Sequence, residues 1–206
     1  MLGRTSDDRG HEIDTPSGRA RVRLSPGGGA GLVLLGHGAG GGIAAPDLLA
    51  VTSTLQGAGW TVGRVEQPYR VRGSRAPARA PALDAAWTAV AAALRPDWPG
   101  PLVTGGRSSG ARVACRTAAA TGAAAVVCLA FPLRPPRRPD TSRADELAAV
   151  DVPLLVVQGE RDPFGGPAAF PAGPTVVAVP GDHSLRRSAA LAAAAVAEWL
   201  AGQSLT

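Results

Sequence analysis

Lysine and asparagine are absent from this sequence, and only two of its 206 residues are cysteine. The formal charge of +5 therefore comes from arginine alone, in a chain that is also rich in alanine, glycine and proline. A strongly basic protein usually suggests a nucleic-acid partner. Here the whole composition shows the bias that GC-rich coding produces. We therefore do not interpret the charge as a binding signal, and we expect no nucleic-acid partner.

Other absences narrow the class of protein further. Two cysteines, Cys115 and Cys128, cannot form a disulfide framework, and we expect both to be reduced and buried. No cluster of His, Cys, Asp and Glu has the spacing of metal ligands, so we expect neither a metal nor another cofactor. Residues 1–10 hold no apolar signal segment, and the alanine-rich stretch 185–200 is too short to span a bilayer. We therefore expect a soluble, cytoplasmic protein without a membrane partner.

The length and the 45% hydrophobic content fit one domain whose core lies on both faces of a sheet. We expect a polar N-terminal segment at residues 1–14 and a single domain at residues 15–202, with no internal repeat. The sequence does not indicate an oligomeric state.

Strand and helix patterns alternate along the domain. Residues 19–24 alternate arginine with apolar residues, as an edge strand does, whereas the later strand candidates are the continuous apolar runs of buried parallel strands. This order predicts an α/β fold with a doubly wound, mostly parallel sheet and helices on both faces. The expected strands are 19–24, 32–35, 60–65, 102–104, 124–131, 153–158 and 175–179, and the expected helices are 46–56, 83–94, 111–120, 142–149 and 185–200.

Gly106, Ser108 and Gly110 form a G-x-S-x-G motif between an expected strand and an expected helix. A serine at the tip of such a turn is strained, and the residues two before and two after it must be small enough for the chain to double back. The pattern indicates that Ser108 is a nucleophile. Ser109 is adjacent, but it does not have glycines two residues away on both sides.

A serine nucleophile needs a base. The sequence contains three histidines. His11 lies in the polar N-terminal segment, and His37 stands before a glycine-rich loop that its ring is expected to brace. His183 follows an expected strand and precedes the last helix, so it is the candidate base.

The base in turn needs an orienting acid, and Asp162 follows the strand before that of His183. Parallel strands present their carboxyl ends at one edge of a sheet, so Ser108, Asp162 and His183 should meet there. Their order along the chain is that of α/β-hydrolases. Glu160 or Asp182 could replace Asp162 as the orienting acid.

Two backbone N–H groups are expected to bind the oxyanion: that of Ser109, directly after the nucleophile, and that of Ala39 in the glycine-rich loop. The same loop admits a second interpretation, because Gly36, Gly38 and Gly41 also satisfy the G-x-G-x-x-G pattern of dinucleotide-binding proteins. That interpretation leaves Ser108 and His183 without a role.

Four ordered segments together resemble the small α/β-hydrolases related to dienelactone hydrolase, and most closely the hydrolase-like domains of the testis-expressed protein 30 and NSL-complex subunit 3 kind. The resemblance covers about residues 15–200 and implies an α/β-hydrolase fold with no large cap domain. Dienelactone hydrolases proper have a cysteine nucleophile where this chain has Ser108. The segments are 36–40, 105–112, 158–165 and 181–183.

These patterns predict a serine hydrolase that cleaves a small carboxylic ester or thioester through an acyl-enzyme. A hydrolase-fold scaffold without turnover is the alternative, although a scaffold needs none of the three polar residues, and transfer of the acyl group to an alcohol or thiol is a third interpretation. Two loops, 69–81 and 131–138, should shape the pocket. The arginines of these loops either favour an anionic substrate or are only solvated. They are Arg70, Arg72, Arg75, Arg79, Arg134, Arg137 and Arg138.

Overall fold

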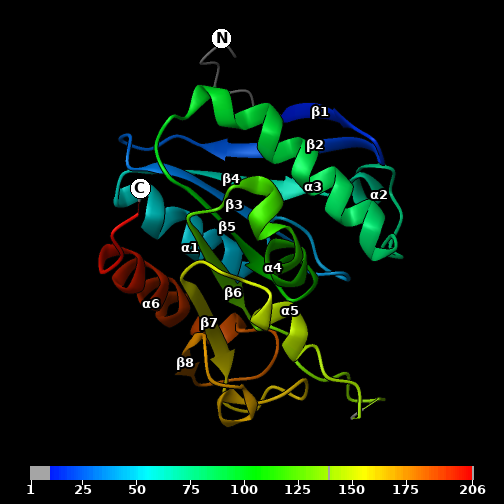
Figure 1. The fold of residues 1–206 in the computed structure, drawn as a ribbon, viewed down its shortest axis with the longest axis vertical. Helices are drawn as coiled ribbons and strands as arrows, with labels where there is room; N and C mark the ends of the chain where they lie inside the picture. The colour runs from blue at the N-terminus through cyan, green and yellow to red at the C-terminus, as the bar shows by residue number, and fades with distance from the viewer. Residues whose placement is uncertain (1–9, 139, 206) are drawn as a thin grey trace.

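The computed structural model describes residues 10–138 and 140–205. Within them, an 8-stranded sheet has the order β1-β2-β4-β3-β5-β6-β7-β8, which Figure 1 shows running from top to bottom. The two pairs that involve β2 are antiparallel, and the other pairs are parallel. The strands are β1 (His11–Thr15), β2 (Gly18–Ser25), β3 (Gly31–Gly36), β4 (Trp60–Glu66), β5 (Leu102–Arg107), β6 (Ala125–Leu129), β7 (Leu154–Gly159) and β8 (Thr175–Val179).

Helices cover both faces of this sheet, as the alternating pattern predicts. On one face α1 and α6 pack on each other, and on the other face α3 and α4 lie side by side. The helices are α1 (Pro46–Gly57), α2 (Pro68–Val71), α3 (Ala80–Leu94), α4 (Ser109–Thr121), α5 (Ala144–Ala148) and α6 (Ala189–Ala201), with short 3₁₀ turns at Arg95–Asp97, Pro167–Ala169 and Arg186–Ser188.

The continuous apolar runs follow from this layering. Successive side chains of a strand point to opposite faces. In β3, Val33 and Leu35 therefore join the core beneath α1 and α6, while Leu32 and Leu34 join the core beneath α3. A strand covered on both faces has no solvent-exposed face, so its residues do not alternate between apolar and polar.

The sheet begins earlier than the sequence analysis predicted. Residues 11–14, which we assigned to a polar N-terminal segment, belong to β1 and pair with β2, while residues 1–9 lie outside the described residues. Only Ile13 of this strand packs against the core, so one apolar side chain among polar neighbours hid the strand. The short helix α2 was also missed, inside the predicted loop 69–81.

Three loops that hold candidate site residues leave the sheet at the same edge. They follow the carboxyl ends of β5, β7 and β8, and the glycine-rich loop after β3 joins them. Within the described residues, no helix is long and apolar enough to cross a membrane. Nor does any group of His, Cys, Asp and Glu in that part of the chain have the arrangement of a metal site. Cys115 and Cys128 are buried free thiols.

Candidate active site

Ser108 stands at the turn between β5 and α4, and we call this turn, residues 106–110, the elbow. Its backbone has φ 52° and ψ −108°. A positive φ costs a residue other than glycine about 1–3 kcal/mol, so the surrounding structure must hold it. The Ser108 N–H donates to the Leu129 carbonyl at 2.9 Å, and the Ser108 carbonyl accepts the N–H of Arg112 at 3.2 Å. The serine is therefore fixed to β6 on one side and to the first turn of α4 on the other.

The two glycines of the motif are required by the neighbouring strand. A Cβ on Gly106 would lie 2.4 Å from the carbonyl oxygen of Gly36, and a Cβ on Gly110 would lie 2.3 Å from the same atom. Neither distance is possible for a real side chain. Glycine at both positions thus lets β5 and α4 lie directly against the end of β3, which is a more specific reason than a tight turn.

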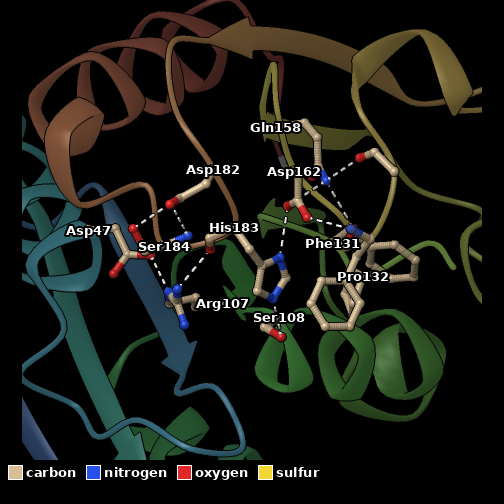
Figure 2. A network of polar contacts seen from close by, with 12 residues as sticks. Asp47, Arg107, Ser108, Phe131, Pro132, Gln158, Asp162, Asp182, His183 and Ser184 are labelled. Atoms are coloured by element: carbon tan, nitrogen blue, oxygen red, sulfur yellow. Dashed lines mark hydrogen bonds and ion pairs between the residues drawn. The ribbon is translucent and has the colours of Figure 1, made fainter. Parts of the chain in front are cut away.

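The three polar residues predicted from the sequence meet at this edge (Figure 2). His183 Nε2 lies 2.9 Å from Ser108 Oγ, and His183 Nδ1 lies 2.8 Å from Asp162 Oδ2. An ionised carboxylate only accepts hydrogen bonds, so Nδ1 carries the proton and Nε2 offers its lone pair to the serine hydroxyl. The arrangement can therefore take a proton from Ser108 as the serine attacks an electrophile.

Asp162 is buried and held from two sides. Its Oδ1 accepts the backbone N–H of Phe164 at 2.8 Å, and its Oδ2 accepts the side-chain amide of Gln158 at 2.9 Å. The same Gln158 amide nitrogen also donates to the carbonyls of Phe131 and Gly165. The carboxylate plane is thereby fixed before it meets the imidazole.

Two residues that contact Asp162, namely Gln158 and Phe164, were not predicted as site residues by the sequence analysis. Gln158 is the next-to-last residue of β7 and is fully buried, and the Phe164 ring lies against the His183 ring with 4.3 Å between centroids. The only sequence signal for them was their place in the 158–165 segment that resembles the hydrolases.

The loop after β7 and the loop after β8 are joined by their backbones. The Arg161 N–H donates to the Gly181 carbonyl at 2.9 Å. Between the loops, a Cβ on Gly159 would come within 2.6 Å of the Asp182 carbonyl oxygen, so only glycine permits this approach. The acid and the base are thus carried by one connected piece of backbone.

The alternative acids do not contact His183. Glu160 is exposed. Asp182 Oδ1 accepts the backbone N–H of Ser184 at 2.9 Å and its hydroxyl at 2.6 Å, and these bonds lower the pKa of the Asp182 carboxyl. In this structure Asp162 is the carboxylate that orients the imidazole.

The two predicted oxyanion donors belong to segments that adjoin Ser108. Ser109 is the first residue of α4, and first-turn N–H groups have no acceptor within their helix. Ala39 lies in the loop after β3, and its neighbour Gly38 packs against the elbow, with 3.6 Å between a Cβ placed there and Ser108 Cβ. The oxyanion role of the Ala39 and Ser109 N–H groups stays a prediction.

His37 fixes the peptide that carries the Ala39 N–H. Its Nδ1 donates to the Gly38 carbonyl at 2.9 Å, while its Nε2 accepts the backbone N–H of Gln67 at 3.2 Å. In a trans peptide the carbonyl and the N–H point in opposite directions. Because the Gly38 carbonyl points toward the His37 ring, the Ala39 N–H of the same peptide points away from it. Burial lowers the pKa of His37, which favours the neutral ring that this pair of bonds requires.

Tyr69 holds the next peptide of the same loop. Its hydroxyl donates to the Ala39 carbonyl at 3.1 Å, and its ring lies 5.7 Å from that of His37. Tyr69 is the second residue of α2, the short helix that the sequence analysis missed. The bracing role predicted for His37 is therefore shared with a helix that no sequence pattern indicated.

The predicted arginine-rich loops lie differently with respect to the site. Arg72 of the first loop donates to the Ser17 carbonyl in the β1–β2 turn. In the second loop, the Arg134 backbone N–H donates to the Phe164 carbonyl at 2.7 Å, next to the ring that packs on His183. The Phe131 carbonyl of this loop accepts the Gln158 amide that also donates to Asp162 (Figure 2).

Comparison with known proteins identifies the same architecture. Residues 29–198 match the model of a family described as an alpha/beta hydrolase domain. No curated protein matches the chain by sequence.

Solved structures with low sequence identity match nearly the whole chain. A lidless α/β serine hydrolase from Xanthomonas campestris is 23% identical, with a TM-score of 0.72, and the match covers 95% of this chain and 96% of that one. Est1E from Butyrivibrio proteoclasticus, solved with ferulic acid, is 18% identical, with a TM-score of 0.78 and coverages of 94% and 98%. A dienelactone hydrolase from Anabaena variabilis is 21% identical, with a TM-score of 0.75 and coverages of 96% and 97%.

Proposed function

The chain belongs to the α/β-hydrolase domain family, and from this membership and the contacts of Ser108, Asp162 and His183 we propose that it is a serine hydrolase that cleaves a carboxylic ester or thioester. The observation that carries the proposal is the continuous chain of contacts from Ser108 Oγ through the imidazole to Asp162 Oδ2. A scaffold would need none of these contacts.

The reaction would proceed in two steps. Ser108 Oγ attacks the acyl carbon while its proton passes to His183 Nε2, and Asp162 stabilises the imidazolium that forms. The backbone N–H groups of Ala39 and Ser109 bind the oxyanion. The imidazolium then gives its proton to the leaving alcohol or thiol, which leaves an acyl-enzyme. A water, deprotonated by the same nitrogen, releases the acid and restores Ser108.

Several finer features of the proposal come from the motifs and from the neighbours. The absence of a lid is described for the Xanthomonas campestris hydrolase, and we extend it to this chain. The closer likeness to the testis-expressed protein 30 and NSL-complex subunit 3 kind stays a prediction from four segments. A cytoplasmic location and a small-molecule ester substrate, with neither nucleic acid nor membrane as a partner, are likewise proposals.

The test is covalent labelling of the serine. Intact mass after exposure to a fluorophosphonate should show one adduct on the wild type, none on Ser108→Ala and a much slower reaction on His183→Ala. Ser53→Ala, which removes an exposed hydroxyl on α1, is the control and should label like the wild type. A folded wild type that never labels would favour the scaffold interpretation.

Charge selectivity needs a separate test. Arg134 is exposed on the loop that is tied to Phe164, so an anionic acyl group would meet it on the way to Ser108. Matched neutral and carboxylate-bearing esters should then differ in kcat/KM, and Arg134→Gln should reduce the difference. Equal kcat/KM for the two esters would remove anionic substrates from the proposal.

A further inference from the structure

Arg107, the residue directly before Ser108, reaches three other segments of the chain, and Figure 2 shows its contacts with the segments of His183 and Asp47. Its Nη2 donates to the main-chain carbonyl of His183 at 2.8 Å, and its Nε lies 2.9 Å from Asp47 Oδ2. Its Nη1 lies 3.1 Å from where a Cβ on Gly38 would be. The planar guanidinium thus contacts the loop after β8 and the start of α1, and it lies against the glycine-rich loop after β3.

Asp47 is the group that holds this guanidinium in place. Its side chain is fully buried, and its other oxygen accepts the backbone N–H of Leu48 at 3.0 Å. Burial raises the pKa of Asp47, and the charge of Arg107 works against that rise. Among the described residues, neither Asp47 Oδ2 nor Arg107 Nε has a hydrogen-bond partner, so their 2.9 Å approach is an ion pair. The two charges therefore depend on each other for compensation.

The loop that Arg107 contacts has few other side-chain anchors. Asp182 and Ser184, on either side of His183, are exposed and bond to each other. The loop backbone is also held by the Arg161 N–H on the Gly181 carbonyl and by the Ser188 hydroxyl on the Pro180 carbonyl. The bond from Arg107 differs from these because it joins the His183 backbone to the residue directly before Ser108. We propose that Arg107, locked by Asp47, is a positioning residue that sets the distance between the His183 backbone and the Ser108 elbow. This inference rests on the proposed function for its effect on rate.

Lysine cannot replace arginine in this role. The guanidinium contacts Asp47 with Nε and His183 with Nη2, which are separate nitrogens of a rigid fork, whereas a lysine offers one ammonium on a flexible stem. Arg107→Lys should keep the ion pair with Asp47 and lose the bond to the His183 carbonyl. Because small displacements of a catalytic group are costly, we expect kcat to fall about 10- to 100-fold in Arg107→Lys. KM should change little, since the substrate contacts are unaltered.

A double variant separates position from stability. Arg107→Met alone leaves the Asp47 carboxylate buried without a counter-charge, which strongly destabilises the fold, whereas Arg107→Met with Asp47→Leu removes both charges, a change that usually restores stability. The double variant should therefore regain most of the melting temperature and keep the loss in kcat. Wild-type kcat in either the folded double variant or Arg107→Lys would overturn the proposal.

The matched control is another arginine ion pair close to Ser108 in the sequence. Arg112, one turn into α4, makes a two-bond contact with Glu146, at 2.9 Å and 2.5 Å. Arg112→Met should lower the melting temperature while kcat stays that of the wild type. An equal fall of kcat in Arg112→Met would mean that general loosening, and not the position of His183, explains the Arg107 variants.

A spectroscopic measurement keeps this inference distinct from the proposed function. The Nδ1 proton that His183 shares with Asp162 should give a low-field proton resonance, identified by its loss in Asp162→Asn. The signal should broaden or vanish in Arg107→Lys and persist in Arg112→Met, whether or not any ester is cleaved. An unchanged signal in Arg107→Lys contradicts the positioning role, and failure of the wild type to label with a fluorophosphonate contradicts only the proposed function.

Discussion

Gln158 illustrates how much of the site depends on single buried side chains. Its amide nitrogen donates to Asp162 Oδ2 and to the carbonyls of Phe131 and Gly165. Leucine has a similar volume and no donor, so Gln158→Leu would remove one hydrogen bond from each acceptor, at a total cost of about 1–3 kcal/mol. Asp162 Oδ2 would keep its contact with His183, and the Phe131 carbonyl would keep the N–H of Leu133. We expect a lower free energy of unfolding in urea and a kcat/KM reduced about tenfold, because the carboxylate plane is no longer fixed. A variant equal to the wild type in both measurements would show that Gln158 does not hold Asp162.

His37 should make stability depend on pH. The pKa of His37 is lowered from 6.5 by burial, against smaller rises from the bond to the Gly38 carbonyl and from the charge of Glu66, while the charge of Arg70 adds a small lowering. The unfolded chain therefore binds a proton at this position at a higher pH than the folded chain does. The contribution is complete above pH 6.5 and is lost as the pH falls from there toward the folded-state pKa.

The matched variant for this effect is His37→Asn. Asparagine places an amide nitrogen at the position of Nδ1, so it can still donate to the Gly38 carbonyl, and it does not titrate. The free energy of unfolding, measured in urea between pH 7.5 and pH 5, should fall less steeply in His37→Asn than in the wild type. Parallel pH profiles would show that His37 titrates equally in both states.

At the scale of elements, the elbow is the junction that tolerates least change. A methyl group on Gly110 would lie 2.3 Å from the Gly36 carbonyl oxygen, so Gly110→Ala must push α4 away from β3. We expect a loss of about 3 kcal/mol or more in the free energy of unfolding, together with loss of labelling at Ser108. Gly57→Ala, at the end of α1 where nothing lies within 4 Å, is the control and should be neutral or stabilising. Equal stability of the two variants would contradict the contact.

The elements also show what the sequence could and could not predict. The buried strands, the helices over them and the positions of Ser108, Asp162 and His183 follow from local patterns, because an apolar run or a glycine-serine-glycine motif is contained in a few residues. β1 was missed because a single residue, Ile13, faces the core. The contacts of Gln158, Tyr69 and Arg107 could not be predicted, since each joins a side chain to a backbone carbonyl that is distant in the sequence.

At the scale of the whole molecule, the candidate site combines residues that follow a buried central strand and a more exposed edge strand of the sheet. Ser108 follows β5, which is central and has five fully buried residues, whereas His183 follows β8, the edge strand, in which only Val179 is buried. Edge elements with few buried contacts open at lower free energy than the core does. The base should therefore leave the site before the sheet unfolds.

Urea titration tests this order of events. Far-UV circular dichroism reports mainly the helices that pack on the sheet, while the rate of fluorophosphonate labelling reports the contact between His183 and Ser108. If β8 and the loop after it open first, labelling should decline at a urea concentration below the dichroism midpoint. Arg107→Lys should widen the gap between the two curves, because the guanidinium anchors that loop to the central elbow. Superimposable curves for the wild type would mean that β8 unfolds with the core, and that the edge of this sheet is as cooperative as its centre.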